Sequence, residues 1–590
     1  ARQLLLETDR RILLLERREA GSAPPQKVGE STVQVGGYYF SRVLDLEEYL
    51  WRHHYMKYNL RFYWRTAGNA AAPDGSATER THNDRFEDYS QAYIRNFSNI
   101  PCYQLDRKVF ESDLLELNDR SERFESVAGA RDLEVDLATG GDAHRVRFRS
   151  GEHSREIAAD WVVDCTGRQR AMARKLGLRK PNPVRHGAVF WWVDGLVDID
   201  RLTDLSTAEI RKKPQRRHQG HLPTWLATNH FCDEGLWFWV IPLQGKTSLG
   251  LVYDKEVVDF TIKDVRTAEL ATDFVCRRFP LFARDLPERE VLEFGAFKDY
   301  SYDCERTIHP DRWAMSGMAG RFSDPLYSPG SDLIAIHNTL IVDAIKTRDR
   351  QALEAQCRLY EPLMRAVYQA YIPSYAESYD TLGDAEAFSL KYTWELTVYF
   401  AGYVFPFLND LFTERRFVLA FMRLFSRLGP INLSVQKLLS GFYQWKKERF
   451  EPAEEPIFHD FTSLGPLAAA EKTFYEIGLP IPEAKAVLSR QVRNLEELAL
   501  FLYAWVASRV VDDPRVLTHA GFLESVDVSK MRFDADEIRE RWRACGPGAD
   551  AAPQTWSFDH RVLEPFRRAG APRETAAAVG APHEVTAGAR

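Results

Sequence analysis

The stretch GLWFWVIPL, residues 235–243, places two tryptophans around one phenylalanine and then reaches a proline. Successive side chains of a strand point to opposite faces, so the pattern predicts a β-strand with Trp237 and Trp239 on one face. Pro242 has no N–H to donate to a neighbouring strand, which predicts a strand end or a sheet edge at that point. A plain core strand is the alternative explanation for the two tryptophans, because large aromatic side chains usually serve packing.

The first residues of the chain predict the end of a helix, a turn at residues 8–10 and a buried strand over residues 12–16. In a dinucleotide-binding βαβ unit, an acidic residue closes the second strand and binds the adenosine ribose. Glu16 holds that position. We expect the glycine-rich turn of such a unit upstream of Ala1. A helix and a strand that merely end in Glu are the alternative.

Two later stretches repeat the order of strand, turn and helix. Residues 161–178 predict a strand that ends in Asp164, a turn with Gly167, and a helix from about Arg168. Residues 311–340 predict a strand, a glycine-rich turn, a loop with prolines and a helix that opens around Ser331. Each helix N-terminus offers free N–H groups that can hold anionic or acceptor atoms of a cofactor.

From about residue 351 the pattern changes to long helical stretches. Residues 371–450 are rich in Tyr, Phe and Trp and suit the cap of a substrate chamber, although a helical core is the favoured interpretation. The stretch RRFVLAFMRLFSRLG sets basic residues around an apolar face. It suits a membrane surface or an acidic carrier protein, but core packing with a solvated basic edge is favoured. The chain end, residues 566–590, predicts a disordered tail.

Composition narrows the class of protein. The 590 residues are 45% hydrophobic and 28% charged, as in globular proteins, and the net charge of -7 gives no basic footprint for nucleic acid. Seven cysteines without a CxxC pair indicate neither a zinc site nor a disulfide framework, and we predict no metal. No uncharged apolar run is long enough to span a bilayer, and no signal or transit peptide is evident. We therefore expect a cytoplasmic protein without membrane contact.

Three features together resemble a known family. Glu16 at a strand end, DCTGR and GRFSDPLYSPGSD, in this order and spacing, resemble the FAD-binding segments of the flavoprotein monooxygenase superfamily. Within that superfamily, WFWVIP matches the WxWxIP signature of flavin-dependent halogenases. The resemblance covers roughly residues 1–345 and implies an α/β fold. We expect a Rossmann-like FAD-binding domain with an inserted mixed or antiparallel β-sheet at about 183–306, then a largely α-helical domain over 346–565.

A lysine completes the resemblance. MKYNLRFYW, residues 56–64, resembles the KxGxxFxWG stretch of halogenases that act on phenols, pyrroles and polyketide-like aromatics. Lys57, Phe62 and Trp64 fit the pattern, whereas Asn59 and Arg65 stand where glycines are usual. KVGEST, residues 27–32, precedes it and is also typical of the family.

The resemblance implies a catalytic role for Lys57. It holds hypohalous acid by a hydrogen bond or becomes a haloamine, and both possibilities stay open. Burial of Lys57 among Tyr55, Tyr58 and Phe62 would lower its pKa and make a neutral amine available near neutral pH. The other catalytic candidates, Trp237 and Trp239, would stand between flavin and substrate.

The resemblance also implies a set of cofactor contacts. Many relatives carry Gly-Asp where this chain has Gly317-Met318, and in those relatives the Asp binds the ribityl chain of FAD. The resemblance therefore makes Asp299 a candidate for this contact, with Asp303 as the alternative. Backbone N–H groups of Gly330 and Ser331 would bind the halide. The residues expected to hold FAD are Glu16, Arg17, Arg107, Asp164, Gly167, Asp324, Pro325, Gly330 and Asp299.

The implied activity is FAD-dependent halogenation of an electron-rich aromatic in secondary metabolism. The resemblance implies reduced FAD from a separate flavin reductase, O2, chloride or bromide, and a phenol, pyrrole or polyketide-like substrate that is free or tethered to a carrier protein. No second dinucleotide fingerprint indicates a nicotinamide site. A flavin-dependent aromatic hydroxylase and a non-catalytic flavin-binding scaffold remain as alternatives.

Overall fold

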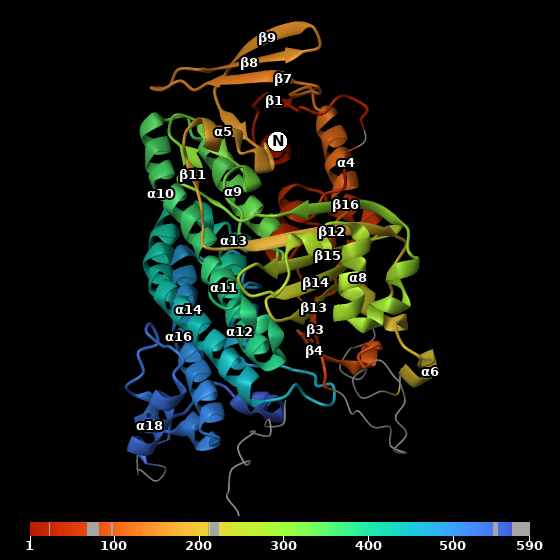
Figure 1. Ribbon diagram of the computed structural model, residues 1–590. Helices are drawn as coiled ribbons and strands as arrows, with labels where there is room; N and C mark the ends of the chain where they lie inside the picture. Colours follow the sequence, from red (N-terminus) through yellow and green to blue (C-terminus); the bar gives the residue numbers. More distant parts are fainter. Residues whose placement is uncertain are drawn as a thin grey trace, which may run out of the picture.

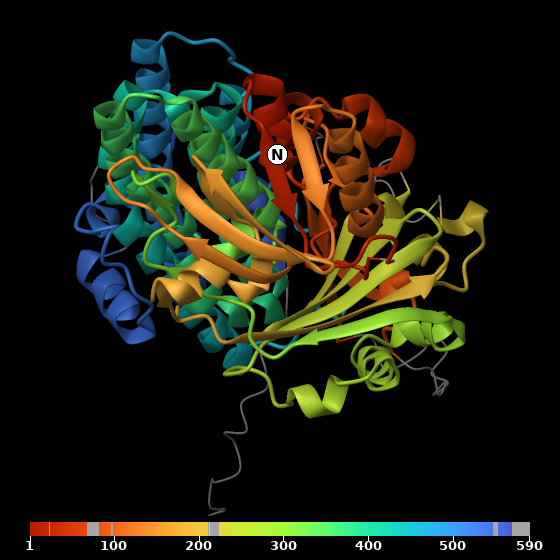
Figure 2. The ribbon, with the colours of Figure 1, turned by 90° about the horizontal axis from the view of Figure 1, so that it is seen from above.

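The computed structural model describes residues 1–22, 24–67, 82–95, 98–210, 212, 223–546 and 553–568. Figure 1 shows a broad twisted sheet on one side, a stack of long helices on the other, and smaller strands near the N-terminus above both. Seen from above in Figure 2, the N-terminal strands lie between the helices and the sheet.

The broad sheet has seven strands. Their order across the sheet is β16 (Val291–Phe297), β12 (His186–Asp194), β15 (Lys246–Asp254), β14 (Leu236–Leu243), β13 (Thr228–Asp233), β3 (Leu60–Arg65) and β4 (Tyr89–Tyr93). All neighbours are antiparallel except β13 and β3. The predicted mixed sheet is thus present. Its last two strands come from residues before 183, because β3 adds in parallel to the edge of β13.

Strand β14 lies inside the sheet, and Pro242 stands near its end, where only one neighbouring strand continues. It pairs with β13 only as far as Val240, which faces Asn229, while its pairing with β15 continues to Leu243. Pro242 therefore faces no β13 residue, as predicted for a strand end. Alternate side chains of β14 pack into two different hydrophobic clusters, one on each face of the sheet. Trp237 and Trp239 belong to the cluster shared with the helices, and Phe238 belongs to the cluster beneath α8 (Ala268–Arg278).

The parallel strands form two smaller groups. β1 (Ile12–Leu15) pairs with β6 (Phe124–Val127), and β10 (Val162–Asp164) pairs with β19 (Trp313–Met315). β18 (Ile308–His309) adds to β19 antiparallel. The predicted strand over residues 12–16 is one residue shorter, and it is half-buried rather than buried because it has a hydrogen-bonded neighbour, β6, on one side. The backbone N–H of Glu16 still donates to the carbonyl of Val127 at 2.9 Å. A three-stranded antiparallel sheet of β7 (Arg131–Asp136), β8 (His144–Ser150) and β9 (His153–Ala159) lies above (Figure 1).

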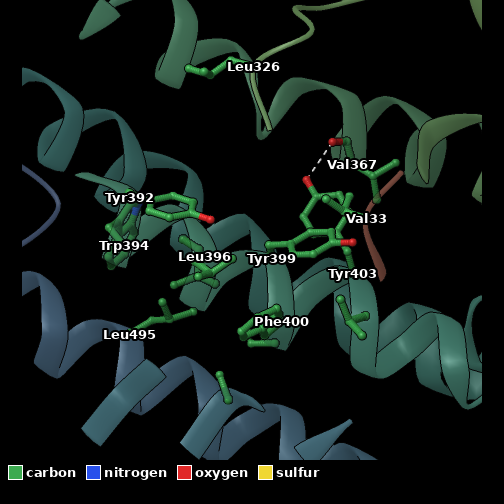
Figure 3. Packing of buried hydrophobic residues seen from close by; sticks show 14 of the residues in the cluster. Val33, Leu326, Val367, Tyr392, Trp394, Leu396, Tyr399, Phe400, Tyr403 and Leu495 are labelled. Atoms are coloured by element: carbon green, nitrogen blue, oxygen red, sulfur yellow. Dashed lines mark hydrogen bonds between the residues drawn. The ribbon is translucent and has the colours of Figure 1, made fainter. Parts of the chain in front are cut away.

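Long helices follow α9 (Pro329–Lys346). They include α10 (Arg350–Gln369), α12 (Ala385–Tyr399), α14 (Arg415–Arg449) and α16 (Ile481–Val510). Residues of these helices and of the sheet share one buried cluster, part of which Figure 3 shows around α12. The predicted boundary between residues 345 and 346 falls at the end of α9. The division into domains stays a prediction, since a common core joins the two parts.

Several further expectations concern the helices and the chain end. The stretch RRFVLAFMRLFSRLG opens α14, where its aromatic side chains are buried and Arg416 and Arg423 are exposed, as the favoured interpretation predicted. None of the helices in the described residues is long and apolar enough to cross a membrane. A 3-10 helix spans His560–Arg568 and so includes the first three residues of the predicted tail. Residues 569–590 lie outside the described part of the chain.

All seven cysteines are free thiols. Among the described residues no group of three or more His, Cys, Asp or Glu side chains is arranged to hold a metal ion.

Candidate active site

A cavity of about 320 Å³ lies between the sheet and the helices. Its walls come from residues 56–60 around the start of β3, residues 98–102, the loop and first turn of α9, and the buried face of α12. Pockets for small ligands start at about this size. Folding therefore brings the lysine motif and the SPGSD motif, which lie far apart in the sequence, to one partly open cavity.

Lys57 follows the short strand β2 (Tyr55–Met56) and lines this cavity. Its side chain is buried, and its Nζ donates to Ser31 Oγ at 2.8 Å and to the carbonyl of Thr32 at 2.7 Å. Both acceptors are uncharged. Burial lowers the pKa of Lys57 to about 8, and the electrostatic interactions with Cys102 and then with Asp332 offset this only in part. About a tenth of the amine is then neutral at pH 7.

Asp332 stands in the first turn of α9 and lines the same cavity. Its Oδ1 accepts a hydrogen bond from the backbone N–H of Gly36 at 2.7 Å, and burial raises the pKa of its carboxyl to about 7. A Cβ at position 36 would lie 2.3 Å from Ser331 Oγ. Glycine is therefore required for α2 (Gln34–Tyr38) to approach the start of α9.

The loop before α9 is strained. Tyr327 and Ser328 are non-glycine residues in the left-handed region, with φ of +67° and +61°. Pro325 opens this loop, and Gly330 and Ser331 follow in the first turn of α9, where helical N–H groups have no partner within the helix. The buried Ser331 Oγ has no hydrogen-bond partner in the described part of the chain.

The two tryptophans of β14 begin a continuous aromatic wall. The ring centroids of Trp237 and Trp239 are 5.7 Å apart, those of Trp237 and His230 5.1 Å, and those of His230 and Phe62 4.7 Å. Phe62 then packs against Tyr392 of α12 at 5.0 Å. Tyr392 lines the cavity and the tryptophans do not, so His230 and Phe62 separate the pair from the space beside Lys57.

A buried carboxyl group that the sequence analysis overlooked is linked to the tryptophan pair. Glu30 of the KVGEST stretch accepts a hydrogen bond from Trp192 Nε1 at 2.6 Å and another from Ser248 Oγ at 2.7 Å. Ser248 Oγ in turn accepts from Trp239 Nε1 at 3.2 Å. Burial raises the pKa of Glu30 to about 7, although its two donors act in the opposite direction.

Asp324, predicted to contact FAD, lies in a buried hydrogen-bond network. Its Oδ2 interacts with His186 Nδ1 at 2.6 Å and accepts from the hydroxyl of Tyr300 at 2.6 Å. Tyr379 donates to its Oδ1 at 3.2 Å and accepts from Trp237 Nε1. Burial by itself would lower the pKa of His186. The carboxylates of Asp324 and Asp254 have a larger effect in the opposite direction and raise the pKa to about 9. The network fixes the loop of α9 against the tryptophan strand.

The remaining cofactor candidates lie at strand ends and turns. Glu16 and Arg17 are exposed directly after β1. Arg107 begins α4 (Arg107–Asp119), where it donates to the carbonyl of Val28 at 2.7 Å and pairs with Glu111. Arg107 therefore lies beside the KVGEST stretch, residues 27–32.

Asp164 ends β10 as predicted, but its oxygens have local partners. Oδ1 accepts from the backbone N–H of Thr166 at 2.8 Å and Oδ2 from that of Met172 at 2.7 Å. Gly167 has φ of +57°, a conformation that glycine adopts without strain, and no atom lies within 4 Å of a Cβ built there. Asp164 therefore shapes the turn whose open side Gly167 forms.

Asp299 and its alternative Asp303 occupy different surroundings. Asp299 is exposed and pairs with Lys255. Asp303 is buried and accepts from Arg321 Nε at 2.9 Å. Asp299 therefore lies apart from the cavity of Lys57, and its contact with FAD stays a prediction.

The geometry shows which signals the sequence left hidden. Asp332 is part of the quoted SPGSD motif and Glu30 part of KVGEST, so both lay in stretches already marked. Glu395 of α12 also lines the cavity, but nothing in its helical surroundings distinguishes it in sequence from a surface carboxylate.

The α/β fold, the strand-end carboxylates and the helix N-terminus at the cavity are arranged as the resemblance to FAD-binding proteins implies. No protein-family model matches the chain. The chain is 23% identical over 397 residues to the flavin-dependent halogenase chlA of Dictyostelium discoideum, which covers 64% of this chain and 62% of that protein. It is 29% identical to the 1H-pyrrole-2-carbonyl-[peptidyl-carrier protein] chlorinase of Pseudomonas fluorescens, over 42% of this chain and 52% of that protein.

A third relative is the tetracycline 7-halogenase of Kitasatospora aureofaciens, with 30% identity over 35% of this chain and 36% of that protein. The chain thus spans between about one third and two thirds of the length of these relatives. The crystal structure of halogenase PltM matches with a TM-score of 0.54 and 16% identity, over 84% of this chain and 93% of that one. The chain is thus similar in sequence to flavin-dependent halogenases and shares the fold of halogenase PltM, which confirms the predicted resemblance and the predicted fold class.

Proposed function

We propose that this protein is an FAD-dependent halogenase that transfers electrophilic chlorine or bromine to an electron-rich aromatic through Lys57. The observation that carries the proposal is a buried lysine on the wall of a cavity, with uncharged acceptors and a pKa lowered to about 8. A structural lysine that is buried to this extent normally has a carboxylate partner. The relatives named above support the reaction class.

The residues present fit a flavin. The exposed Glu16 at the end of β1, the open turn at Gly167 and the first turn of α9 offer an acceptor, free space and N–H donors. Glu16 and Arg17 would hold the adenosine end, and Arg107, Asp164, Asp299, Asp324 and Pro325 would shape the rest of the site. When bound in reduced form, FAD supplies the oxidising equivalent from O2 that turns chloride or bromide into hypohalous acid. A separate flavin reductase would supply the reduced form.

The halide would bind at the start of α9. The backbone N–H groups of Gly330 and Ser331 point along the positive end of an 18-residue helix, and the unpartnered Ser331 Oγ can donate as well. Asp332, one residue further, carries a carboxyl whose pKa burial raises to about 7. A partly protonated carboxyl repels an anion less than an ordinary carboxylate does.

Lys57 would hold the oxidant at its Nζ. A protonated amine hydrogen-bonds the hypohalous oxygen. The neutral amine instead attacks the halogen as a nucleophile, the halogen–oxygen bond breaks, and hydroxide leaves with an amine proton as water, which gives a haloamine. With a pKa of about 8 both forms are populated near neutral pH. Trp237 and Trp239, with His230 and Phe62 beside them, would keep the aromatic substrate away from the flavin while the small oxidant passes.

The test is mass spectrometry of phenol, pyrrole and carrier-tethered substrates incubated with the protein, FAD, a flavin reductase, NADH, O2 and chloride or bromide. We expect a product with the halogen isotope pattern that disappears in Lys57→Ala, while FAD binding is retained. A product heavier by one oxygen would instead indicate an aromatic hydroxylase. Failure of the protein to bind FAD would favour the non-catalytic scaffold.

A further inference from the structure

Glu395 faces the cavity with one oxygen in use and one free. Its Oε1 accepts from Lys391 Nζ at 2.6 Å and from Gln436 Nε2 at 3.0 Å. Its Oε2 is buried and accepts no hydrogen bond from the described residues. The side chain is only 10% exposed and lines the cavity. A buried carboxylate oxygen without a donor costs free energy, so a ligand that supplies the donor is expected.

A second unpartnered group lies close to Glu395. The hydroxyl of Tyr327 is buried and makes no hydrogen bond of acceptable geometry with the described chain. Burial, then the charge of Glu395 and the direct approach of its carboxylate to the hydroxyl, raise the pKa of Tyr327 well above its ordinary value. The two groups therefore face each other across the cavity wall without forming a well-aligned hydrogen bond. The ring is held by stacking on Tyr392, with centroids 5.1 Å apart, and by the strained backbone of the loop before α9.

We propose that Glu395 and Tyr327 form a subsite for a phenolic hydroxyl of the substrate. The inference rests on the proposed halogenase function and specifies its substrate class. A hydroxyl group donates one hydrogen bond and accepts others, so it can satisfy Glu395 Oε2 and Tyr327 O–H at once. A pyrrole N–H donates but does not accept, and it would leave Tyr327 without a partner.

The cavity has room for this arrangement. Glu395, Tyr327 and Lys57 all line the same space of about 320 Å³, so a ring anchored at the first two lies in the chamber that the Lys57 amine borders. Lys391 keeps Glu395 paired while leaving Oε2 free, and its Nζ lies 5.6 Å from the centre of the Tyr327 ring. A phenol that donates to a carboxylate gains electron density in its ring, which favours attack on an electrophilic halogen.

The first test measures binding of phloroglucinol and of its trimethyl ether to the full chain by isothermal titration calorimetry. The ether keeps the ring but has no O–H to donate. Glu395→Gln places an amide N–H₂ where Oε2 stood, because Lys391 and Gln436 still require an acceptor at the other position. We expect phloroglucinol to bind the wild type roughly ten- to hundred-fold more tightly than the ether does, and Glu395→Gln to abolish that preference.

Tyr327→Phe provides a variant that keeps the folded core. It removes a hydroxyl that forms no well-aligned hydrogen bond with the described residues, so the free energy of unfolding should not fall by more than about 1 kcal/mol, while phloroglucinol should bind roughly three- to ten-fold more weakly. The matched control is Tyr403→Phe. The hydroxyl of Tyr403 already donates to the carbonyl of Val367 at 2.8 Å (Figure 3), so its loss should reduce stability without changing the preference for phloroglucinol.

Two results would overturn the subsite. In the first, the wild type binds phloroglucinol no more tightly than the ether, a comparison that needs no variant to fold. In the second, Glu395→Gln and Tyr327→Phe weaken both ligands equally. Failure of the halogenase function itself is distinguished by the product assay, since a protein that binds phloroglucinol through this subsite but never halogenates refutes the activity and not the subsite.

Discussion

Two lysines are buried to nearly the same degree in different parts of this protein, with 7% of Lys57 and 4% of Lys446 exposed. Lys446, on α14, donates to Asp384 at 2.8 Å and lies 2.9 Å from Glu386, and although burial lowers its pKa these carboxylates raise it above the ordinary value. Lys57 has only a hydroxyl and a carbonyl as acceptors, and burial lowers its pKa to about 8. The same side chain is thus a fixed cation in the helical core and a titratable amine at the cavity.

The difference extends to the groups around each lysine. In the helical core Glu386 also pairs with Arg509, and although burial raises its pKa the two cations bring it down to about 2. At the cavity Tyr327 and Glu395 each keep a buried polar atom without a partner in the described chain. Such atoms also occur near Lys446, at Trp445 Nε1 and at both ring nitrogens of His459. The two regions therefore differ in how their charges are paired, which fixes the charge of Lys446 and leaves Lys57 free to titrate.

The largest expected effect is the loss of halogenation when Lys57, the titratable lysine of the comparison, is replaced. Lys57→Met should reduce the rate of halogenation at least about a thousand-fold, because it removes the amine that holds the oxidant. The free energy of unfolding at pH 7 should not fall and should rise by up to about 3 kcal/mol, since a buried protonated amine without a carboxylate partner destabilises the fold. Product mass spectrometry and urea denaturation measure the two quantities. Lys437→Met, at an exposed position of α14, is the matched control. Wild-type halogenation by Lys57→Met would remove Lys57 from the reaction.

Lys446→Met tests whether the other buried lysine stabilises the helical core. The substitution leaves the buried Glu386 with only one of its two cations, and we expect it to lower the free energy of unfolding by about 3–5 kcal/mol. Urea denaturation against the wild type measures the change. A loss below about 1 kcal/mol would show that the ion pairs around Lys446 do not stabilise the helical core.

The two lysines should also respond to pH in opposite directions. Lys57 has a folded pKa of about 8, below its value in the unfolded chain, so the unfolded state binds more protons between pH 8 and about 10.5. Its destabilising contribution is complete below pH 8 and is relieved, by up to about 3 kcal/mol, as the pH rises to 10.5. The folded pKa of Lys446 is raised, so its stabilisation is complete below about pH 10.5 and is lost above that.

Unfolding free energies of the wild type and of Lys57→Met, measured between pH 7 and 10, isolate the contribution of Lys57. The wild type should gain stability relative to the variant across this range. A difference that is independent of pH would mean that Lys57 titrates normally in the folded protein.

The smallest expected effect, a shift in the pH profile of halogenation, distinguishes whether the neutral or the protonated amine of Lys57 acts in the reaction. The carboxylate of Asp332 raises the pKa of Lys57, so Asp332→Asn should lower it below about 8 while the amide oxygen still accepts from Gly36. The pH profile of halogenation should move to lower pH. A rate at pH 7 that rises by up to about threefold would indicate the neutral amine and a haloamine, and a rate that falls would indicate the protonated hydrogen-bond donor. An unchanged profile would exclude coupling between Asp332 and Lys57.

Much of the fold and part of the site could be predicted because their signals are local. Alternating side chains in residues 235–243 correctly placed Trp237 and Trp239 on one face, and the apolar run before Glu16 correctly gave a parallel strand with an acidic residue at its end. The environment of Lys57 was also predictable in direction, since neighbouring aromatic residues indicated burial. The contact of β3 with β13 was missed because it joins segments about 170 residues apart.

The sequence by itself determined the motifs, the type of each element and the presence of a buried lysine, since these follow from the period of the side chains along a short stretch. Only the tertiary structure decided which charges meet. It brought Asp332 to Gly36, gave Asp324 to His186 and Tyr300, and placed Glu395 of α12 on the cavity wall with Lys57. Burial and the distance between charges set a pKa, and both arise from contacts between segments that are distant in the chain.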